Sequence, residues 1–198
     1  MSLIISKNKK LLKELIYEEV NGKPIYYKNY KLVIKGKKAL EEVKMSSPIQ
    51  SKIVSLILYF LISRIDKSRY EILSHEIGVR TKLGKRAIDI GIFEKIEVNK
   101  FIEKSSILPI CPIIAIEIDT KAQLKEDEYM NYIYDKANDL LNSGTEKVIW
   151  ILTKPKIILI AQKEKSWEIK KWNDDIEVME NIKFNLNRLL KEEIWKPL

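Results

Sequence analysis

The sequence has very little of several residues that mark special classes of protein. Its 198 residues include one cysteine, Cys111, which excludes an internal disulfide, and only six glycines and six prolines. This composition excludes collagen-like and low-complexity chains. The longest largely apolar run, residues 53–62, is well short of the roughly 20 residues that a membrane-spanning helix needs. The first residues lack the long apolar core of a signal peptide. We therefore expect a cytoplasmic protein that does not cross a membrane.

The charge is strongly positive. Lys and Arg number 36 against 28 Asp and Glu, which gives a net charge of +8, and the first 50 residues alone contain 11 lysines and 5 glutamates. Such an excess favours a polyanionic partner such as DNA. A lysine-rich composition also arises from genome bias or thermal adaptation, so both readings stay open.

The hydrophobic pattern predicts a single domain over residues 1–198 with an α/β or α+β fold. Asn21-Gly22 is a strong hairpin signal, and residues 47–62 form a predicted helix with Ser47 as its N-cap. Strands are predicted at 70–73, 78–80, 87–93, 112–121, 147–153 and 156–163, and a long helix at 123–144. A strand, a helix and a further strand in that order predict a crossover unit, and hence a mixed central sheet flanked by helices.

We divide this domain into three parts: an N-terminal helix and hairpin extension (1–45), a core (46–165) and a C-terminal strand and helix (166–198). The apolar helix around residues 53–62 has more hydrophobic surface than one face of a sheet can cover. We therefore expect a homodimer.

The stretch "PIIAIEIDTK", residues 112–121, ends a buried strand with two carboxylates. Because side chains alternate along a strand, Glu117 and Asp119 are expected on one face and Ile116 and Ile118 on the other. Burying two like charges together is costly unless a cation compensates, which makes a metal ion a natural partner. The alternative is that the strand surfaces here and both carboxylates are simply solvated.

A third carboxylate lies inside another predicted strand. Asp89 in "AIDIGIF" is unusual there, because Asp is rare both in strands and in protein interiors. Asp89, Glu117 and Asp119 could converge on one Mg²⁺ or Mn²⁺, which prefer carboxylate oxygens. A nearby cation would orient the attacking water or offset developing charge, and the candidates are Lys136, with Lys121 as the alternative.

Basic residues precede the strand that carries Asp89. Lys82, Lys85 and Arg86 in "TKLGKRAID" are the most plausible phosphate contacts, although a solvated turn explains them equally well. Glu19 and Gln50 are assigned no role, and His75, the only histidine, is expected to be structural or on the surface.

The order and spacing of several motifs resemble the Uma-type restriction endonucleases, a branch of the PD-(D/E)xK nuclease superfamily. The resemblance runs from about residue 17 to about residue 162 and rests on these motifs: "YEEVNGKPIYY", "SSPIQSKIV", "AIDIGIF", "IIAIEIDTK" and "YIYDKANDLLNSGTEKVIWIL". It implies a restriction-endonuclease-like fold and metal-dependent hydrolysis of DNA.

By this resemblance, Asp89 and Glu117 take the places of the two metal-binding acids, and Lys136 that of a lysine on the following helix. Two positions depart from the superfamily pattern. Ile88 stands where a proline is usual, and Asp119 stands where a lysine is usual. Asp119 is therefore either a further ligand or a mark of divergence. The alternative function is a catalytically inactive nuclease fold that binds nucleic acid or regulates a partner.

Overall fold

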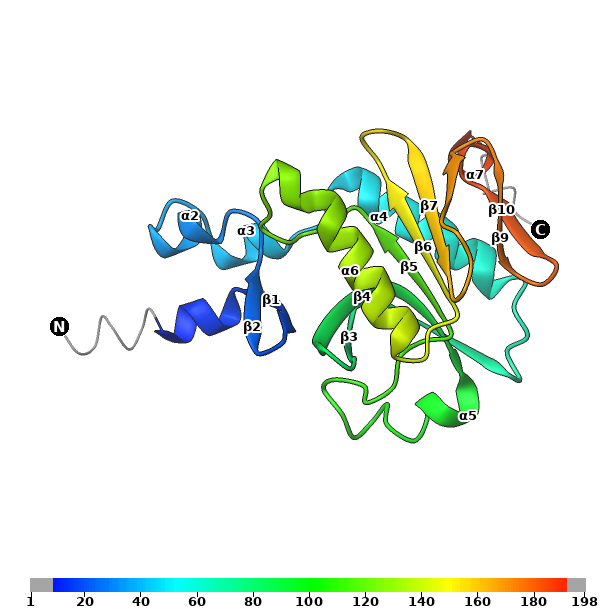
Figure 1. Ribbon diagram of the computed structural model, residues 1–198, viewed down its shortest axis with the longest axis horizontal. Coiled ribbons are helices and arrows are strands. Elements are labelled where there is room, and N and C mark those ends of the chain that lie inside the picture. The colour runs from blue at the N-terminus through cyan, green and yellow to red at the C-terminus, as the bar shows by residue number, and fades with distance from the viewer. Residues whose placement is uncertain (1–8, 192–198) are drawn as a thin grey trace.

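The computed structural model describes residues 9–191, which form one large mixed sheet and a small second sheet (Figure 1). The large sheet has eight strands, in the order β2-β1-β4-β5-β6-β7-β8 with β3 paired to β4. Its strands are β1 (Ile16–Val20), β2 (Lys23–Tyr26), β3 (Tyr70–Arg80), β4 (Gly84–Glu94), β5 (Ile114–Ile118), β6 (Lys147–Leu152), β7 (Ile157–Gln162) and β8 (Glu168–Lys171). The small sheet pairs β9 (Asp175–Met179) with β10 (Ile182–Asn185).

Helices cover both faces of the large sheet. Helix α6 (Tyr129–Asn142) lies in front of it in the view of Figure 1, and α4 (Pro48–Ile62) lies behind it. The remaining elements are α2 (Tyr30–Ile34), α3 (Leu40–Lys44), α5 (Lys95–Val98), the 3₁₀ turn η1 (Glu126–Glu128) and α7 (Leu186–Lys191). No helix within residues 9–191 combines the length and the hydrophobicity that crossing a bilayer requires.

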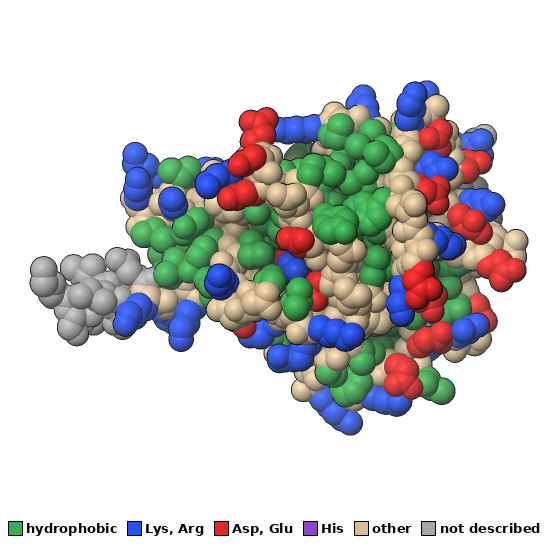
Figure 2. All heavy atoms as spheres, viewed as in Figure 1, with side chains coloured by type: hydrophobic (Ala, Val, Ile, Leu, Met, Phe, Trp, Pro, Cys, Tyr) green, Lys and Arg blue, Asp and Glu red, His purple; other side chains and the backbone are tan. Residues whose placement is uncertain are grey.

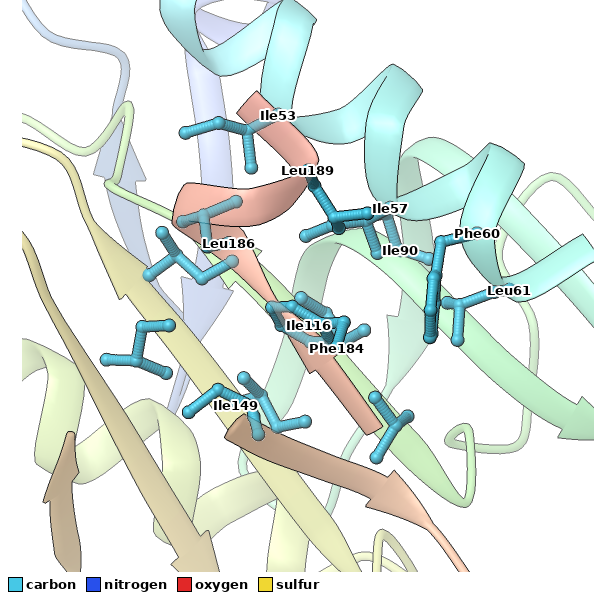
Figure 3. Packing of buried hydrophobic residues seen from close by; sticks show 14 of the residues in the cluster. Ile53, Ile57, Phe60, Leu61, Ile90, Ile116, Ile149, Phe184, Leu186 and Leu189 are labelled. Atoms are coloured by element: carbon cyan, nitrogen blue, oxygen red, sulfur yellow. The ribbon is translucent and has the colours of Figure 1, made fainter. Parts of the chain in front are cut away.

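Each face of the sheet has its own hydrophobic core. On the α4 face, Ile57 of α4 packs with Ile116 and Ile149 of the sheet and with Phe184 and Leu189 from the C-terminal elements (Figure 3). Burying each such side chain contributes about 1.5–3 kcal/mol. The C-terminal elements thus cover part of the apolar surface of α4 within the same chain. The expected homodimer stays a prediction.

The α6 face is held together by a second cluster. Ile133, Ala137 and Leu140 of α6 pack with Trp150 of β6 and Ala115 of β5. Strands β5 and β6 are parallel and are joined through α6, so the predicted crossover unit is present. Helix α6 begins at 129, not at 123, because η1 occupies the preceding residues. Gly144, with φ of +113°, follows the end of the helix as predicted.

Strand β3 is continuous where two short strands were predicted. His75 and Glu76 interrupt its pairing with β4 and have φ of 79° and 54°. Non-glycine residues rarely adopt this left-handed conformation. The two residues form a bulge, and this bulge explains why the sequence pattern breaks between 73 and 78.

The N-terminal hairpin is joined to the large sheet. Val20 of β1 pairs with Gly84 of β4, and β5 pairs with β4 further along, from Ile90 to Ile92. Strand β3 runs along β4 from 85 to 94, and a strand has only two edges. Strands β1 and β5 therefore share the other edge of β4. Between them, residues 86–88 of β4 have no strand partner on that edge, and the polar side chains described next fill this gap.

Candidate active site

Asp89 and Glu117 lie opposite each other on neighbouring strands. Ile90 pairs with Ile116 in the antiparallel pair β4–β5, and continuing this register by one residue pairs Asp89 with Glu117. The backbone N–H of Ile118 donates a 2.8 Å hydrogen bond to Oδ2 of Asp89. Directly opposite residues point to the same face, here the face that α6 covers. The structure thus brings together the two acids that the sequence suggested as metal ligands.

Lys136 reaches this pair from α6. Its ammonium nitrogen lies 3.0 Å from Oε1 of Glu117 and 2.8 Å from Oε1 of Glu18, and it donates a 2.6 Å hydrogen bond to the carbonyl oxygen of Ala87. The side chain is completely buried. Aromatic rings surround it, with centroids 5.4–6.0 Å from the nitrogen; they belong to Tyr17, Tyr132 and Trp150. Lys136, not Lys121, is therefore the lysine in contact with Glu117.

Glu18 is a member of the site that the sequence analysis missed. Its carboxylate accepts hydrogen bonds from Arg86 Nη1 at 3.0 Å, from the hydroxyl of Tyr132 at 2.9 Å and from the backbone N–H of Ala87 at 3.1 Å. The neighbouring acid Glu19 instead lies on the surface, 3.7 Å from Lys85. The signal available in the sequence was the Asn-Gly hairpin, which places two acids on opposite faces of one strand without showing which face is buried.

Arg86 does not fit the phosphate contact that we predicted for it. Its side chain is 2% exposed, and its Nε donates a 2.8 Å hydrogen bond to Oδ2 of Asp139 on α6. Asp139 also accepts a 2.8 Å hydrogen bond from the hydroxyl of Thr81. Because the strand begins at Gly84, Arg86 lies inside the sheet and not on an entering loop. Lys82 is exposed and Lys85 is partly exposed, so these two can still meet a phosphate.

The environment of each carboxyl group sets its protonation. Burial alone raises the pKa of Glu18, but Lys136 and Arg86 outweigh it and the pKa is lowered. Burial raises the pKa of Glu117 well above its ordinary range, with Lys136 opposing and Asp89 adding to the rise. Burial also raises the pKa of Asp89. The pKa of Lys136 is raised because its two carboxylate partners outweigh the effect of burial, so the lysine stays charged.

Asp119 lies apart from the other two acids, and the prediction that it shares a face with Glu117 is wrong. Strand β5 ends at Ile118, and Asp119 has φ of 55°, so the alternation of side chains does not extend to it. Its carboxylate accepts hydrogen bonds from the backbone N–H and the hydroxyl of Thr153, at 2.8 and 2.5 Å. Within residues 9–191, no three His, Cys, Asp or Glu side chains are grouped so that they could hold a metal ion. The candidate metal site therefore consists of two carboxylates, Asp89 and Glu117, without Asp119.

The bulge in β3 places a further charged pair beside Asp89. Asp89 lies across from the bulge, because Ile88 and Ile90 pair with the residues on either side of it. Glu76 in the bulge accepts a 3.1 Å hydrogen bond from the hydroxyl of Tyr27 and forms an ion pair with Lys121. The charges of Lys121 and Glu76 act in opposite directions on the pKa of Asp89. Lys121 thus lies near Asp89 and is 11% exposed.

Comparison with known proteins adds a likeness in fold. No family model matches the sequence, and no match is found among curated proteins. A solved structure described as "a putative nuclease belonging to DUF820" from Anabaena variabilis ATCC 29413 superposes with a TM-score of 0.67 at 16% sequence identity. The match covers 92% of this chain and 96% of that chain. The predicted fold class, a restriction-endonuclease-like mixed sheet flanked by helices, is confirmed.

Proposed function

We propose that the protein is a metal-dependent nuclease that hydrolyses phosphodiester bonds of DNA. The observation that carries the proposal is the placement of Asp89 directly opposite Glu117, with Lys136 at 3.0 Å from Glu117. Two carboxylates and a lysine on one face of a sheet supply the charges that phosphodiester hydrolysis needs. The likeness to a structure described as a nuclease and the net charge of +8 support the same reading.

The chemistry of the donors fits a divalent metal ion. Glu117 is buried, and within residues 9–191 its side chain has one polar partner, the ammonium group of Lys136 at 3.0 Å from Oε1. A carboxylate with a single partner keeps lone pairs for a metal ion, and Asp89 supplies the second carboxylate. Mg²⁺ is usually held by one or two carboxylates, with water and substrate phosphate as its other ligands. A bound Mg²⁺ or Mn²⁺ would polarise the phosphate and lower the pKa of a water molecule.

Lys136 has a defined role in this scheme. Because its pKa is raised, it stays protonated and does not act as the general base. Its three contacts hold the ammonium group in place, so its charge can offset the negative charge that grows on the phosphate in the transition state. Glu18 and Arg86 are positioning residues: Glu18 pairs with Lys136, and Arg86 pairs with Glu18.

One observation favours a second candidate function, an inactive nuclease fold that binds nucleic acid. Glu117 is 1% exposed and Lys136 is fully buried, so neither group meets solvent in this structure. A protein of this kind would bind DNA without cutting it.

Cleavage of supercoiled plasmid separates the two functions. With Mg²⁺ or Mn²⁺, the proposed nuclease converts plasmid to nicked or linear forms, and Asp89→Asn and Glu117→Gln each abolish the reaction. Asp135→Asn serves as the control, because Asp135 is an exposed acid on α6 that lies outside the pair. Binding without cleavage supports the inactive module, and cleavage that survives Glu117→Gln contradicts our assignment of the site.

A further inference from the structure

A groove of about 940 Å³ begins where β5 ends. Asp119, Thr120 and Lys121, which directly follow β5, form part of its wall. Gln50 also lines it and donates a 2.7 Å hydrogen bond to the carbonyl oxygen of Ile118, whose N–H binds Asp89. The groove therefore begins two residues after Glu117, although Asp89, Glu117 and Lys136 do not themselves line it. Its other walls come from the start of α6, the β6–β7 turn, and the segments around α3 and after β2.

The groove is mostly apolar inside. Figure 2 shows hydrophobic side chains gathered where the upper end of α6 meets β6 and β7. Met130 at the start of α6 is 52% exposed, and Met45 across the groove is 68% exposed. Tyr129 is partly buried beside them. Further apolar lining is provided by Val43, Leu124, Leu152, Pro155 and Ile157. Contacts to phosphate alone do not require such a surface.

Lysines stand on two sides of this apolar surface. Lys28, just after β2, and Lys154, in the β6–β7 turn, both line the groove and are exposed. Neither has an ion-pair partner among residues 9–191, whereas the lining residues Lys38 and Lys125 pair with Glu42 and Glu128. The groove lining contains five lysines and three acids, so its net charge is positive, and a positive margin around an apolar surface matches a ligand that has both phosphates and flat apolar groups.

We propose that this groove binds unpaired nucleotides of the substrate strand next to the bond that is cut. This inference rests on the proposed nuclease function. In duplex DNA the faces of the bases are covered by their neighbours, so an apolar groove beside the backbone would find nothing to contact. In an unpaired strand the bases can stack on Tyr129 and pack on Met130, while Lys28 and Lys154 contact phosphates. The preferred substrate is then single-stranded DNA or a junction with a single-stranded arm.

A second copy of this chain is a poorer occupant. It would carry the same net charge of +8 and would approach two lysines that form no ion pair with any residue from 9 to 191. Like charges at an interface oppose association. The positive margin of the groove instead matches a nucleic acid.

The test compares binding of one labelled oligonucleotide as a single strand and as a duplex, by fluorescence anisotropy in EDTA so that no cleavage occurs. The wild type should bind the single strand more tightly. Tyr129→Ala should weaken single-strand binding by about 5- to 150-fold, the range that loss of one stacked base gives, and leave duplex binding unchanged. Tyr134→Ala is the matched control, because Tyr134 also lies on α6, is 56% exposed, and does not line the groove. Met130→Ala, at an exposed position, keeps the test valid if Tyr129→Ala impairs folding.

The lysines are tested in the same assay. In the double variant Lys28→Ala/Lys154→Ala, the slope of log affinity for the single strand against log salt concentration should become shallower by about 1.4. This is the change expected for two lost phosphate contacts. Lys23→Ala with Lys52→Ala removes the same charge from exposed positions outside the groove and should leave the slope unchanged.

Several results would overturn the inference. One is a duplex that binds as tightly as the single strand, with Tyr129→Ala indistinguishable from Tyr134→Ala. Another is a dimer in solution that Tyr129→Ala or Met130→Ala dissociates, since a second copy would then occupy the groove. If cleavage depends on Glu117 while groove variants keep full activity, the inference fails and the nuclease function stands. If neither DNA form binds and neither is cut, both fail.

Discussion

Glu18 and Glu117 contact the same ammonium group of Lys136, at 2.8 and 3.0 Å, yet their pKa values are shifted in opposite directions. The difference lies in their other partners. Glu18 also accepts hydrogen bonds from Arg86, Tyr132 and a backbone N–H, whereas Lys136 is the one polar partner of the Glu117 side chain within residues 9–191. Glu18 is therefore a structural acid, and Glu117 has the capacity left to bind a ligand.

This difference predicts opposite effects on stability. Glu18→Gln should lower the free energy of unfolding by about 3 kcal/mol, because it breaks a buried ion pair and leaves Arg86 with one partner fewer. Glu117→Gln removes a charge whose burial is poorly compensated, so it should change stability by less than about 1 kcal/mol or increase it. Urea unfolding at pH 7 measures both. An equal loss in the two variants would contradict the account.

The two carboxyl groups also predict opposite dependences on pH. Glu18 has a lowered pKa in the folded protein, so its stabilising contribution is present above its ordinary value of 4.5 and is lost as the pH falls through the folded pKa. Glu117 has a raised pKa, so it costs stability as the pH rises from 4.5 towards the folded pKa. The stability advantage of Glu117→Gln over the wild type should therefore grow with pH in that window. Unfolding curves from pH 4.5 to 8 test this, and an advantage that shrinks would count against it.

The two candidate lysines should differ in stability as well as in position. Lys136→Met leaves two buried carboxylates without their cation and should cost about 3–5 kcal/mol. Lys121→Met breaks a pair that is partly exposed to solvent and should cost about 1 kcal/mol or less. Adding Glu117→Gln to Lys136→Met should restore part of the loss. Denaturant unfolding of the wild type, Lys136→Met, Glu117→Gln and the double variant gives the coupling free energy between the two residues. Additive losses of stability would show that Lys136 and Glu117 do not interact.

The thiol of Cys111 should react slowly. Burial raises its pKa to about 12, so at pH 8 its thiolate fraction should be on the order of 1000-fold below that of a cysteine with the ordinary value of 9.0. A thiol reagent that absorbs on reaction would show slow modification of the native protein and fast modification in denaturant. Rapid reaction of the native protein would place Cys111 in a more open environment than the structure does.

The sequence predicted the crossover unit and the approach of Asp89 to Glu117 on one face, because period-two and helical patterns report which face of an element is buried. Asp119 was misplaced because the pattern does not show where a strand stops, and the left-handed Asp119 ended β5 at Ile118, three residues before the predicted end at 121. Glu18 was missed, and Arg86 was given the wrong role, for a different reason. Glu18 accepts a hydrogen bond from the backbone N–H of Ala87 in the part of β4 between β1 and β5, and Arg86 pairs with Glu18 there. Only the strand order of the folded sheet reveals that gap.

The most direct test of the account is the position of Mn²⁺ in crystals of the protein, located by its anomalous scattering. We predict one ion in contact with the carboxylates of both Asp89 and Glu117, and its absence from crystals of Glu117→Gln grown and soaked in the same way. An ion that keeps the same position in Glu117→Gln, or wild-type crystals in which Mn²⁺ binds elsewhere and not between these two acids, would contradict the proposed metal site.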